Sequence, residues 1–131
     1  MNLPGIADEE FIRDKVPMTK EEIRILTMCK AKIRPDNIIW DIGAGTGSLS
    51  IEAALLAPQG EVYAIEKKDL AVDLLHQNIA KFKLEDKVKI IATEAQKGLD
   101  ELPNCDVVFI YVSSKHMFEI LDIINSKLNE G

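Results

Sequence analysis

Short apolar runs alternate along the chain with longer segments in which apolar residues recur at helical spacing. The short runs are rich in β-branched residues and predict strands at residues 38–42, 62–65, 88–92 and 107–110. Helical spacing predicts helices at residues 20–33, from residue 48 to the turn at 58–60, and at 70–84, 95–102 and 117–128. Strands that alternate with helices are typical of βαβ units. The pattern therefore predicts an α/β protein with a parallel sheet.

The chain is predicted to form one domain, residues 1–131. With 131 residues, 47% of them hydrophobic, it can bury one core but not two. An N-terminal lead-in and helix occupy residues 1–34, and the sheet core occupies residues 35–131. Within the lead-in, Thr19 stands three residues before Glu22, which is the spacing of a capping box. We therefore expect Thr19 to cap the first helix.

The formal net charge of −6 argues against a general nucleic-acid binder, because neutralising phosphates requires a concentration of Lys and Arg. One local cluster of cations does occur, within twelve residues of the lead-in and the first helix. It consists of Arg13, Lys15, Lys20 and Arg24. The cluster is read either as a local binding patch or as the solvated start of a helix.

Hydrophobic patterning and cysteine spacing predict a cytoplasmic protein that neither enters a membrane nor binds a metal. No apolar run approaches the ~18 residues of a membrane span, and acidic residues stand where a signal peptide would be basic and then apolar. Cys29 and Cys105 lie far apart, with no Cys-x-x-Cys motif and no His at ligand spacing. We interpret both cysteines as small core residues.

A glycine-rich turn follows the first predicted strand. After Asp41, the chain has glycine at three alternate positions, Gly43, Gly45 and Gly47. Glycines allow a sharp bend and a close approach to a ligand that a Cβ atom would obstruct. The position just outside the carboxyl end of a central strand is typical of nucleotide-type sites. The dinucleotide fingerprint needs a further glycine where Ser48 stands, so the spacing favours S-adenosylmethionine over NAD.

An acidic residue, Glu66, ends the second predicted strand about twenty residues beyond the glycines. An acid at this place can accept both ribose hydroxyls of a nucleoside. The structural alternative is that Glu66 caps a helix. The combination of this acid with the glycine-rich turn favours the ribose role. The third strand ends at Thr93, Glu94 and Ala95, where amides could flank an adenine ring or simply begin a helix.

Three blocks of sequence together carry a resemblance to a known family, at residues 10–13, 16–24 and 41–48. They resemble the cobalt-precorrin-6B C15-methyltransferases (decarboxylating) of cobalamin biosynthesis, and the resemblance runs through essentially all 131 residues. The glycine-rich block is common to many class I methyltransferases, whereas residues 16–24 are the specific part. The resemblance implies transfer of the methyl group of S-adenosylmethionine to C15 of a tetrapyrrole, a corrin precursor, with loss of the C12 acetate carboxyl as carbon dioxide. It also implies a homo-oligomer, often a tetramer.

For the fold, the resemblance implies a Rossmann-like class I methyltransferase sheet with parallel strands in the order 3-2-1-4 and helices on both faces. Such sheets normally have seven strands, and only four are readable here. Residues 128–131 look like the approach to a fifth. We therefore expect a C-terminally truncated sheet whose fourth strand has one unpaired edge.

The resemblance also assigns site residues. Cofactor contacts are implied for Thr19, Gly43, Ala44, Gly45, Thr46, Gly47, Glu66 and Ala95. Catalytic residues are not identified, because a nucleophilic ring carbon needs alignment and exclusion of water more than a strong base. Cations are needed for the carboxylates of the substrate. The candidate cations are Arg13, Lys15, Lys20, Arg24 and Lys115, and Ser113 is a further candidate for substrate binding.

The loop after the fourth strand departs from the family pattern. The family usually has Gly-Gly-Ser-Gly there, whereas residues 111–116 read Tyr-Val-Ser-Ser-Lys-His. Other functions therefore stay open: a different small-molecule or protein class I methyltransferase, a non-catalytic subunit that binds S-adenosylmethionine, and, less favoured, an NAD-dependent oxidoreductase.

Overall fold

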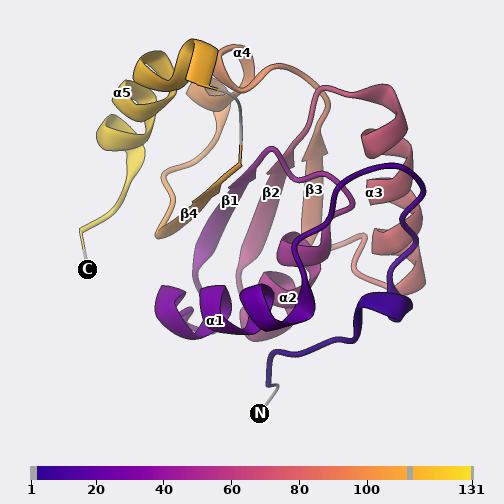
Figure 1. Ribbon diagram of the computed structural model, residues 1–131. Helices are drawn as coiled ribbons and strands as arrows, with labels where there is room; N and C mark the ends of the chain where they lie inside the picture. The colour runs from indigo at the N-terminus through magenta and orange to yellow at the C-terminus, as the bar shows by residue number, and fades with distance from the viewer. Residues whose placement is uncertain (1–2, 112–113, 131) are drawn as a thin grey trace.

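A four-stranded parallel sheet forms the centre of the molecule (Figure 1). The computed structural model describes residues 3–111 and 114–130. The strands are β1 (Ile38–Ile42), β2 (Glu61–Ile65), β3 (Val88–Ile91) and β4 (Val107–Ile110). They lie in the order β3-β2-β1-β4. The predicted strands and their order are confirmed.

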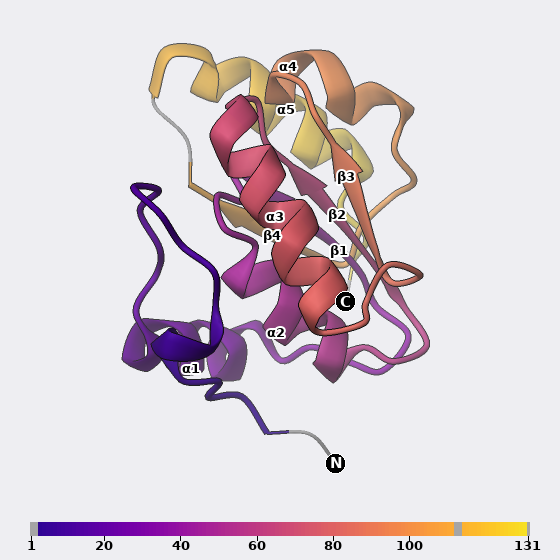
Figure 2. The same cartoon turned by 90° about the vertical axis from the view of Figure 1, so that its right-hand side faces the viewer.

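Helices cover both faces of the sheet (Figures 1 and 2). Three helices lie on one face: α1 (Glu21–Ala31), α2 (Ser48–Leu56) and α3 (Asp69–Lys81). The short α4 (Ala95–Gly98) and the longer α5 (Met117–Lys127) lie on the other. A 3-10 turn, Leu99–Glu101, extends α4, and another, Ser114–His116, precedes α5. The two-faced arrangement agrees with the prediction.

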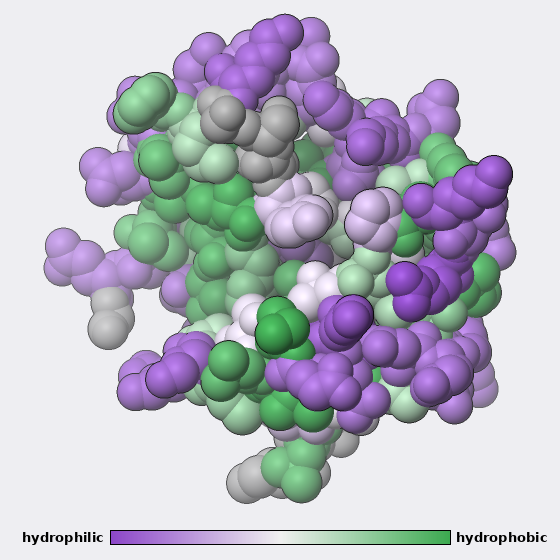
Figure 3. Space-filling view, in the orientation of Figure 1, coloured by the Kyte–Doolittle hydropathy of each residue, from purple (hydrophilic) through white to green (hydrophobic). Residues whose placement is uncertain are grey.

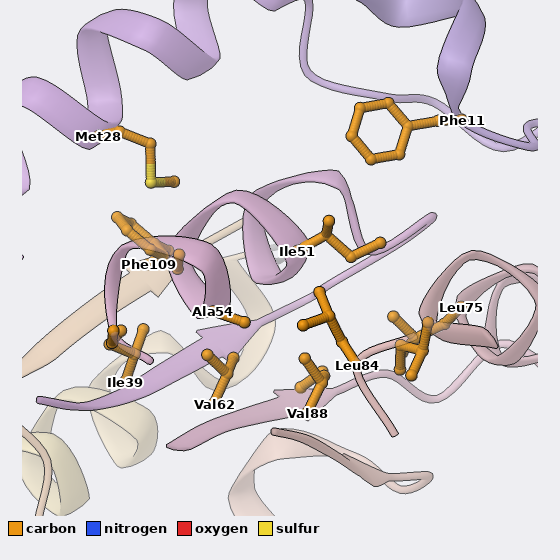
Figure 4. Close-up of a cluster of buried hydrophobic side chains, with 14 residues drawn as sticks. Phe11, Met28, Ile39, Ile51, Ala54, Val62, Leu75, Leu84, Val88 and Phe109 are labelled. Atoms are coloured by element: carbon orange, nitrogen blue, oxygen red, sulfur yellow. The ribbon is translucent and has the colours of Figure 1, made fainter. Parts of the chain in front are cut away.

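Alternation along the strands sends neighbouring side chains into two separate cores. Ile39 of β1 packs with Met28, Ile51 and Leu75 of the first helical layer, in the cluster drawn in Figure 4. Trp40, the next residue along β1, packs instead against the layer formed by α4 and α5. A central parallel strand needs apolar residues on both faces, and β1 has them.

The first helix starts without the predicted cap. Its N-cap residue is Lys20, and no side-chain hydrogen bond closes the helix start. The Thr19 carbonyl instead accepts a hydrogen bond from the guanidinium of Arg24. The capping-box expectation is therefore wrong, because a side chain from the following turn of helix determines the path of the chain here.

The two cysteines differ in environment. Cys105 is buried in the second core, as expected, and burial raises the pKa of its thiol to about 12. Cys29 is exposed on α1, so its assignment to the core is wrong. The neighbouring Met28 is the residue of this turn that is buried.

The outer edge of β4 borders an apolar surface. Within β4 only Phe109 is buried, and Ile110 is exposed. Among the described residues, no strand pairs with this edge. A groove lies between β4 and α1. Its lining comprises Leu26, Thr27, Lys30, Ala31, Val107, Val108 and Phe109. Figure 3 shows apolar surface gathered on the left of the molecule, where β4 lies between α1 and α5.

After α5 the chain returns to the sheet, where it lies beside the residues that precede β4. Leu128 forms an isolated parallel bridge with Cys105. The Cys105 amide donates to the Lys127 carbonyl at 2.9 Å, and the Asn129 amide donates to the Cys105 carbonyl at 2.7 Å. Residues 128–129 thus lie alongside the amino end of β4, which agrees with the expected approach to a fifth strand.

No helix in the described ranges has the length and apolar character needed to cross a membrane.

The side chain of Arg24 ties the lead-in to the helical layer from a fully buried position. Its Nε donates to Glu52 of α2 at 3.0 Å, and its Nη1 donates to Asp8 at 2.7 Å. The remaining donors reach the carbonyls of Thr19 and Ile6. A guanidinium that is buried and donates hydrogen bonds from all three of its nitrogens within the protein is not available to a substrate. The predicted substrate role of Arg24 is therefore wrong.

Replacing Arg24 should strongly destabilise the protein. In Arg24→Leu the carboxylate of Glu52 would stay buried without its cation, and a broken buried ion pair typically costs about 3–5 kcal/mol. Urea denaturation measures the loss. Lys30→Leu, which removes an exposed cation from the same helix, should change stability by no more than about 0.5 kcal/mol, and the double variant Arg24→Leu/Glu52→Leu should recover part of the loss. If Arg24→Leu lowered the free energy of unfolding by as little as Lys30→Leu does, the structural role assigned to Arg24 would be contradicted.

Candidate functional site

The glycine-rich turn lies at the carboxyl end of β1 and bends toward β2. Gly43, Gly45 and Gly47 all have left-handed backbone angles, with φ of 80°, 59° and 89°. The amides of Gly43 and Ala44 donate to the carbonyl of Ile65, the last residue of β2, at 2.8 and 3.1 Å. These hydrogen bonds hold the turn over the end of β2, where ligands bind in open parallel sheets.

The glycines of the turn have different tasks. A Cβ atom at Gly47 would lie 2.3 Å from Cδ1 of Leu75, so this glycine is needed for α2 and α3 to pack. A Cβ atom at Gly45 would meet only the Pro17 carbonyl at 3.5 Å and Val16 Cγ1 at 3.8 Å. The sequence assigned all the glycines to a ligand. The structure shows that at Gly47 the lack of a side chain serves helix packing, and a cofactor contact there stays a prediction.

The carboxylate of Glu66 is fixed against the turn. Its Oε1 accepts a hydrogen bond from the Gly45 amide at 2.9 Å. Its Oε2 accepts from the amides of Lys67 and Lys68, each at 3.0 Å. The side chain is buried and spans 21 positions of sequence to reach Gly45. The predicted juxtaposition of Glu66 with the glycine turn is thus found in the structure.

A second acid, Asp41, lies beneath the turn in β1. It is buried, and its Oδ2 accepts a hydrogen bond from Ser50 Oγ at 2.6 Å. Burial raises the pKa of the Asp41 carboxyl to about 6, and the nearby charge of Glu66 adds to the rise. The sequence showed an acid before the glycines but gave it no role. Here it ties β1 to the first turn of α2.

The lead-in passes beside the turn as a strap, by which we mean residues 12–19. Its midpoint lies next to Gly45, as the positions of Val16 and Pro17 show. Asn78 of α3 holds its start, with Nδ2 donating to the carbonyl of Ile12 at 2.8 Å. No sequence signal identified Asn78, because a lone Asn within a helical pattern is unremarkable.

Other predicted cofactor residues lie around the same turn or on the same rim. Thr46 is buried, and its Oγ1 has no hydrogen-bond partner among the described residues. Thr19 is half-buried at the end of the strap. Ala95 starts α4 beyond the carboxyl end of β3, and its side chain packs in the second core. A cofactor contact of Ala95 would therefore use its backbone, and this assignment stays a prediction.

The predicted substrate cations divide into available and unavailable groups. Arg13 and Lys15 are exposed on the strap, and Lys20 is exposed beside it. Lys115 is exposed in the 3-10 turn before α5. Ser113 lies outside the described residues. With Arg24 buried, three cations of the N-terminal cluster remain free to meet a ligand.

A family model and individual relatives of known sequence point to the same protein family. The model of the precorrin methyltransferase domain matches residues 9–131. A protein of Sulfurisphaera tokodaii named "Probable cobalt-precorrin-6B C(15)-methyltransferase (decarboxylating)" is 47% identical over 134 aligned positions, covering 100% of this chain and 69% of its own length. A protein of the same name from Sulfolobus acidocaldarius is 42% identical with the same coverage.

A solved structure extends the likeness to the fold. The crystal structure of precorrin-6y C5,15-methyltransferase from Geobacter metallireducens superposes with a TM-score of 0.90 at 38% identity. The match covers 98% of this chain and 69% of that one. Both the sequence relatives and this structure are therefore longer than the chain described here.

Ionisation of Asp41 should make the stability depend on pH. Its folded pKa of about 6 exceeds the ordinary 3.8, so the folded protein holds this proton more tightly than the unfolded chain. The resulting stability is fully present below pH 3.8 and is lost as the pH rises through about 6. Asp41→Asn cannot ionise and escapes this loss. Its free energy of unfolding relative to the wild type should rise by up to about 3 kcal/mol from about pH 4 to pH 7.

Urea denaturation at several pH values measures this difference. Asp36→Asn, which alters an exposed acid, is the matched control and should show little change with pH. A constant difference between Asp41→Asn and the wild type across the range would contradict a raised pKa.

Proposed function

The chain belongs to the precorrin methyltransferase domain family, and we propose that it methylates a corrin precursor with S-adenosylmethionine as the methyl donor. The proposed substrate is cobalt-precorrin-6B, methylated at C15 with loss of the C12 acetate carboxyl as carbon dioxide. The observation that carries the proposal is the hydrogen bond between Glu66 and the Gly45 amide. It brings Glu66, the acid proposed to bind the ribose, next to the glycine turn.

The residues of this region fit S-adenosylmethionine. A carboxylate offers about four lone-pair sites, and three backbone amides use three of those on Glu66. The free site is on Oε1, the oxygen that also accepts the Gly45 amide, and one ribose hydroxyl can take it. The second hydroxyl would share Oε2 with the amides of Lys67 and Lys68. The left-handed turn brings backbone, rather than side chains, next to the methionine part of the cofactor. When bound, the cofactor supplies an electrophilic methyl group.

The chain's own task is then mainly alignment. A ring carbon with enamine character is already nucleophilic, so a positioned acceptor and a dry site lower the barrier without a strong base. The strap lies beside Gly45, and we expect it to form one wall of that site. Decarboxylation draws on the electron demand of the macrocycle, and no residue of this chain is assigned to it.

Substrate carboxylates require cations at the rim, and Arg13, Lys15 and Lys20 are the proposed partners. Two of them lie on the strap itself, beside the turn that would hold the cofactor. Lys115, in the 3-10 turn before α5, is proposed to add a further contact, and the contact of Ser113 stays a prediction from the sequence. Because Arg13, Lys15, Lys20 and Lys115 are exposed, we expect their contributions to be modest and sensitive to salt.

Cellular location and assembly are also proposals. We expect the protein to act in the cytoplasm and to form a homo-oligomer, with a tetramer as the predicted state. Light scattering on the purified protein would measure the mass directly. The expected binding partners include neither nucleic acid nor membrane.

Replacing Glu66 should weaken the binding of S-adenosylmethionine and of S-adenosylhomocysteine by the same factor. Glu66→Gln keeps the size of the side chain but loses the charge that strengthens hydrogen bonds from hydroxyls, an effect of roughly 1–2 kcal/mol or about tenfold in affinity. S-adenosylmethionine and S-adenosylhomocysteine carry the same ribose, so calorimetry should show equal losses for both. Glu61→Gln, at the opposite end of β2, is the control and should leave both affinities unchanged. A loss for only one form would contradict the ribose role.

The proposed reaction should release two measurable products, a methylated tetrapyrrole and carbon dioxide. With cobalt-precorrin-6B and methyl-labelled S-adenosylmethionine, the label should enter the tetrapyrrole and carbon dioxide should be released. Lys15→Ala should raise KM for the tetrapyrrole about two- to fivefold with kcat unchanged, the effect of one exposed charge. Lys30→Ala, an exposed cation on α1, should change neither constant.

The outcomes separate the rival functions. Methyl transfer to another acceptor, with none to the tetrapyrrole, would favour a different class I methyltransferase. Cofactor binding without transfer to any acceptor would favour a non-catalytic subunit.

A further inference from the structure

Asn78 connects two segments that are far apart in sequence, the strap and the glycine turn. Its side chain projects from α3 and is fully buried. Oδ1 accepts a hydrogen bond from the Ile12 amide at 2.7 Å, and Nδ2 donates to the Ile12 carbonyl at 2.8 Å. Nδ2 also donates to the Thr46 carbonyl at 2.9 Å. One side chain thus holds the start of the strap and the middle of the turn together.

The chemistry of these contacts requires an amide. Two carbonyls face Nδ2 and one N–H group faces Oδ1, so both donors of Nδ2 and an acceptor site of Oδ1 are used. Aspartate would put an acceptor against two carbonyls, and leucine would leave all three backbone groups unpaired. Both changes remove the link between Ile12 and Thr46 while preserving the approximate size of the side chain.

The strap is also held at its other end. Arg24 donates to the carbonyl of Thr19, so the buried guanidinium and Asn78 fix opposite ends of residues 12–19. Between these anchors, Arg13 and Lys15 are exposed, and Val16 and Pro17 lie beside Gly45. Met18 of the strap also packs against the first core. Of the two side chains that anchor the strap by hydrogen bonds, only Asn78 also contacts the turn.

We propose that Asn78 is a positioning residue that couples the strap to the glycine turn, so that cofactor binding and ordering of the strap favour each other. The proposal rests on the assignment of this turn to S-adenosylmethionine. Coupling of this kind is reciprocal: whatever the strap adds to cofactor affinity, the cofactor adds to the ordering of the strap.

A second link between α3 and the lead-in provides a matched control. Lys81, one turn further along α3, donates through Nζ to the carbonyl of Glu10, which precedes the strap. This contact is exposed, and it does not reach the turn. Lys81→Met should therefore loosen the lead-in without altering the turn. Ile79→Val, a change at a buried residue of the same helix, controls for a general loss of stability.

Calorimetry with S-adenosylhomocysteine tests the coupling in the full chain. Asn78→Leu should weaken its binding about tenfold, the effect of roughly one or two ordinary hydrogen bonds. Asn78→Asp should act in the same direction. Lys81→Met and Ile79→Val should bind within about twofold of the wild type at a temperature where all variants are folded. Equal affinities for Asn78→Leu and Lys81→Met would overturn the proposal.

Limited trypsin digestion of the wild type tests the reciprocal effect and does not need a variant that folds. Lys15 is exposed on the strap, and Lys83 is exposed after α3. S-adenosylhomocysteine should slow cleavage after Lys15 several-fold more than cleavage after Lys83. Equal slowing at both sites, or none at Lys15 despite binding, would overturn the inference alone. Failure of the wild type to bind S-adenosylhomocysteine would instead overturn the cofactor assignment, and this inference with it.

Discussion

The buried guanidinium of Arg24 is the contact on which the N-terminal part of the structure depends. It joins α1 to Glu52 of α2, and it holds the lead-in through Asp8 and two backbone carbonyls. A charge removed from water needs partners, and here they come from three parts of the chain: Ile6 and Asp8, Thr19, and Glu52. The lead-in is therefore part of the packed domain, which allows a segment without strands to form a wall beside the glycine turn.

The candidate site consists of a turn of left-handed glycines and two acidic side chains that are held in place by hydrogen bonds. Glycines with left-handed backbone angles bend the chain over the end of β2. The Glu66 carboxylate stabilises this bend by accepting a hydrogen bond from the Gly45 amide. Asp41 supports the turn from below through Ser50. Burial, with the nearby charge of Glu66, raises the pKa of Asp41, which is the cost of a negative charge at this place. A positively charged sulfonium ligand nearby would relieve part of this cost.

The sequence predicted those features that depend on local pattern. Apolar runs located β1 to β4 to within a residue or two, and the glycine turn and Glu66 could be paired because carboxyl ends of parallel strands meet at one edge. Arg24, Asn78 and Cys29 could not be placed in this way. Their environments depend on which helix face meets the lead-in, and that is a tertiary property. Arg24 lay in a cluster of cations, so its sequence neighbours pointed to solvent although its packing partners bury it.

The unequal cysteines give the chain a ready point of attachment for a reporter group. The thiolate is the nucleophile that attacks thiol reagents, and burial with a pKa near 12 keeps Cys105 protonated and shielded at neutral pH. Cys29 is exposed on α1, the helix that lines the apolar groove beside β4. A fluorophore placed on Cys29 in the unaltered protein would therefore be attached at one position. Its polarity-sensitive emission would report when another polypeptide surface comes to rest along that side of the sheet.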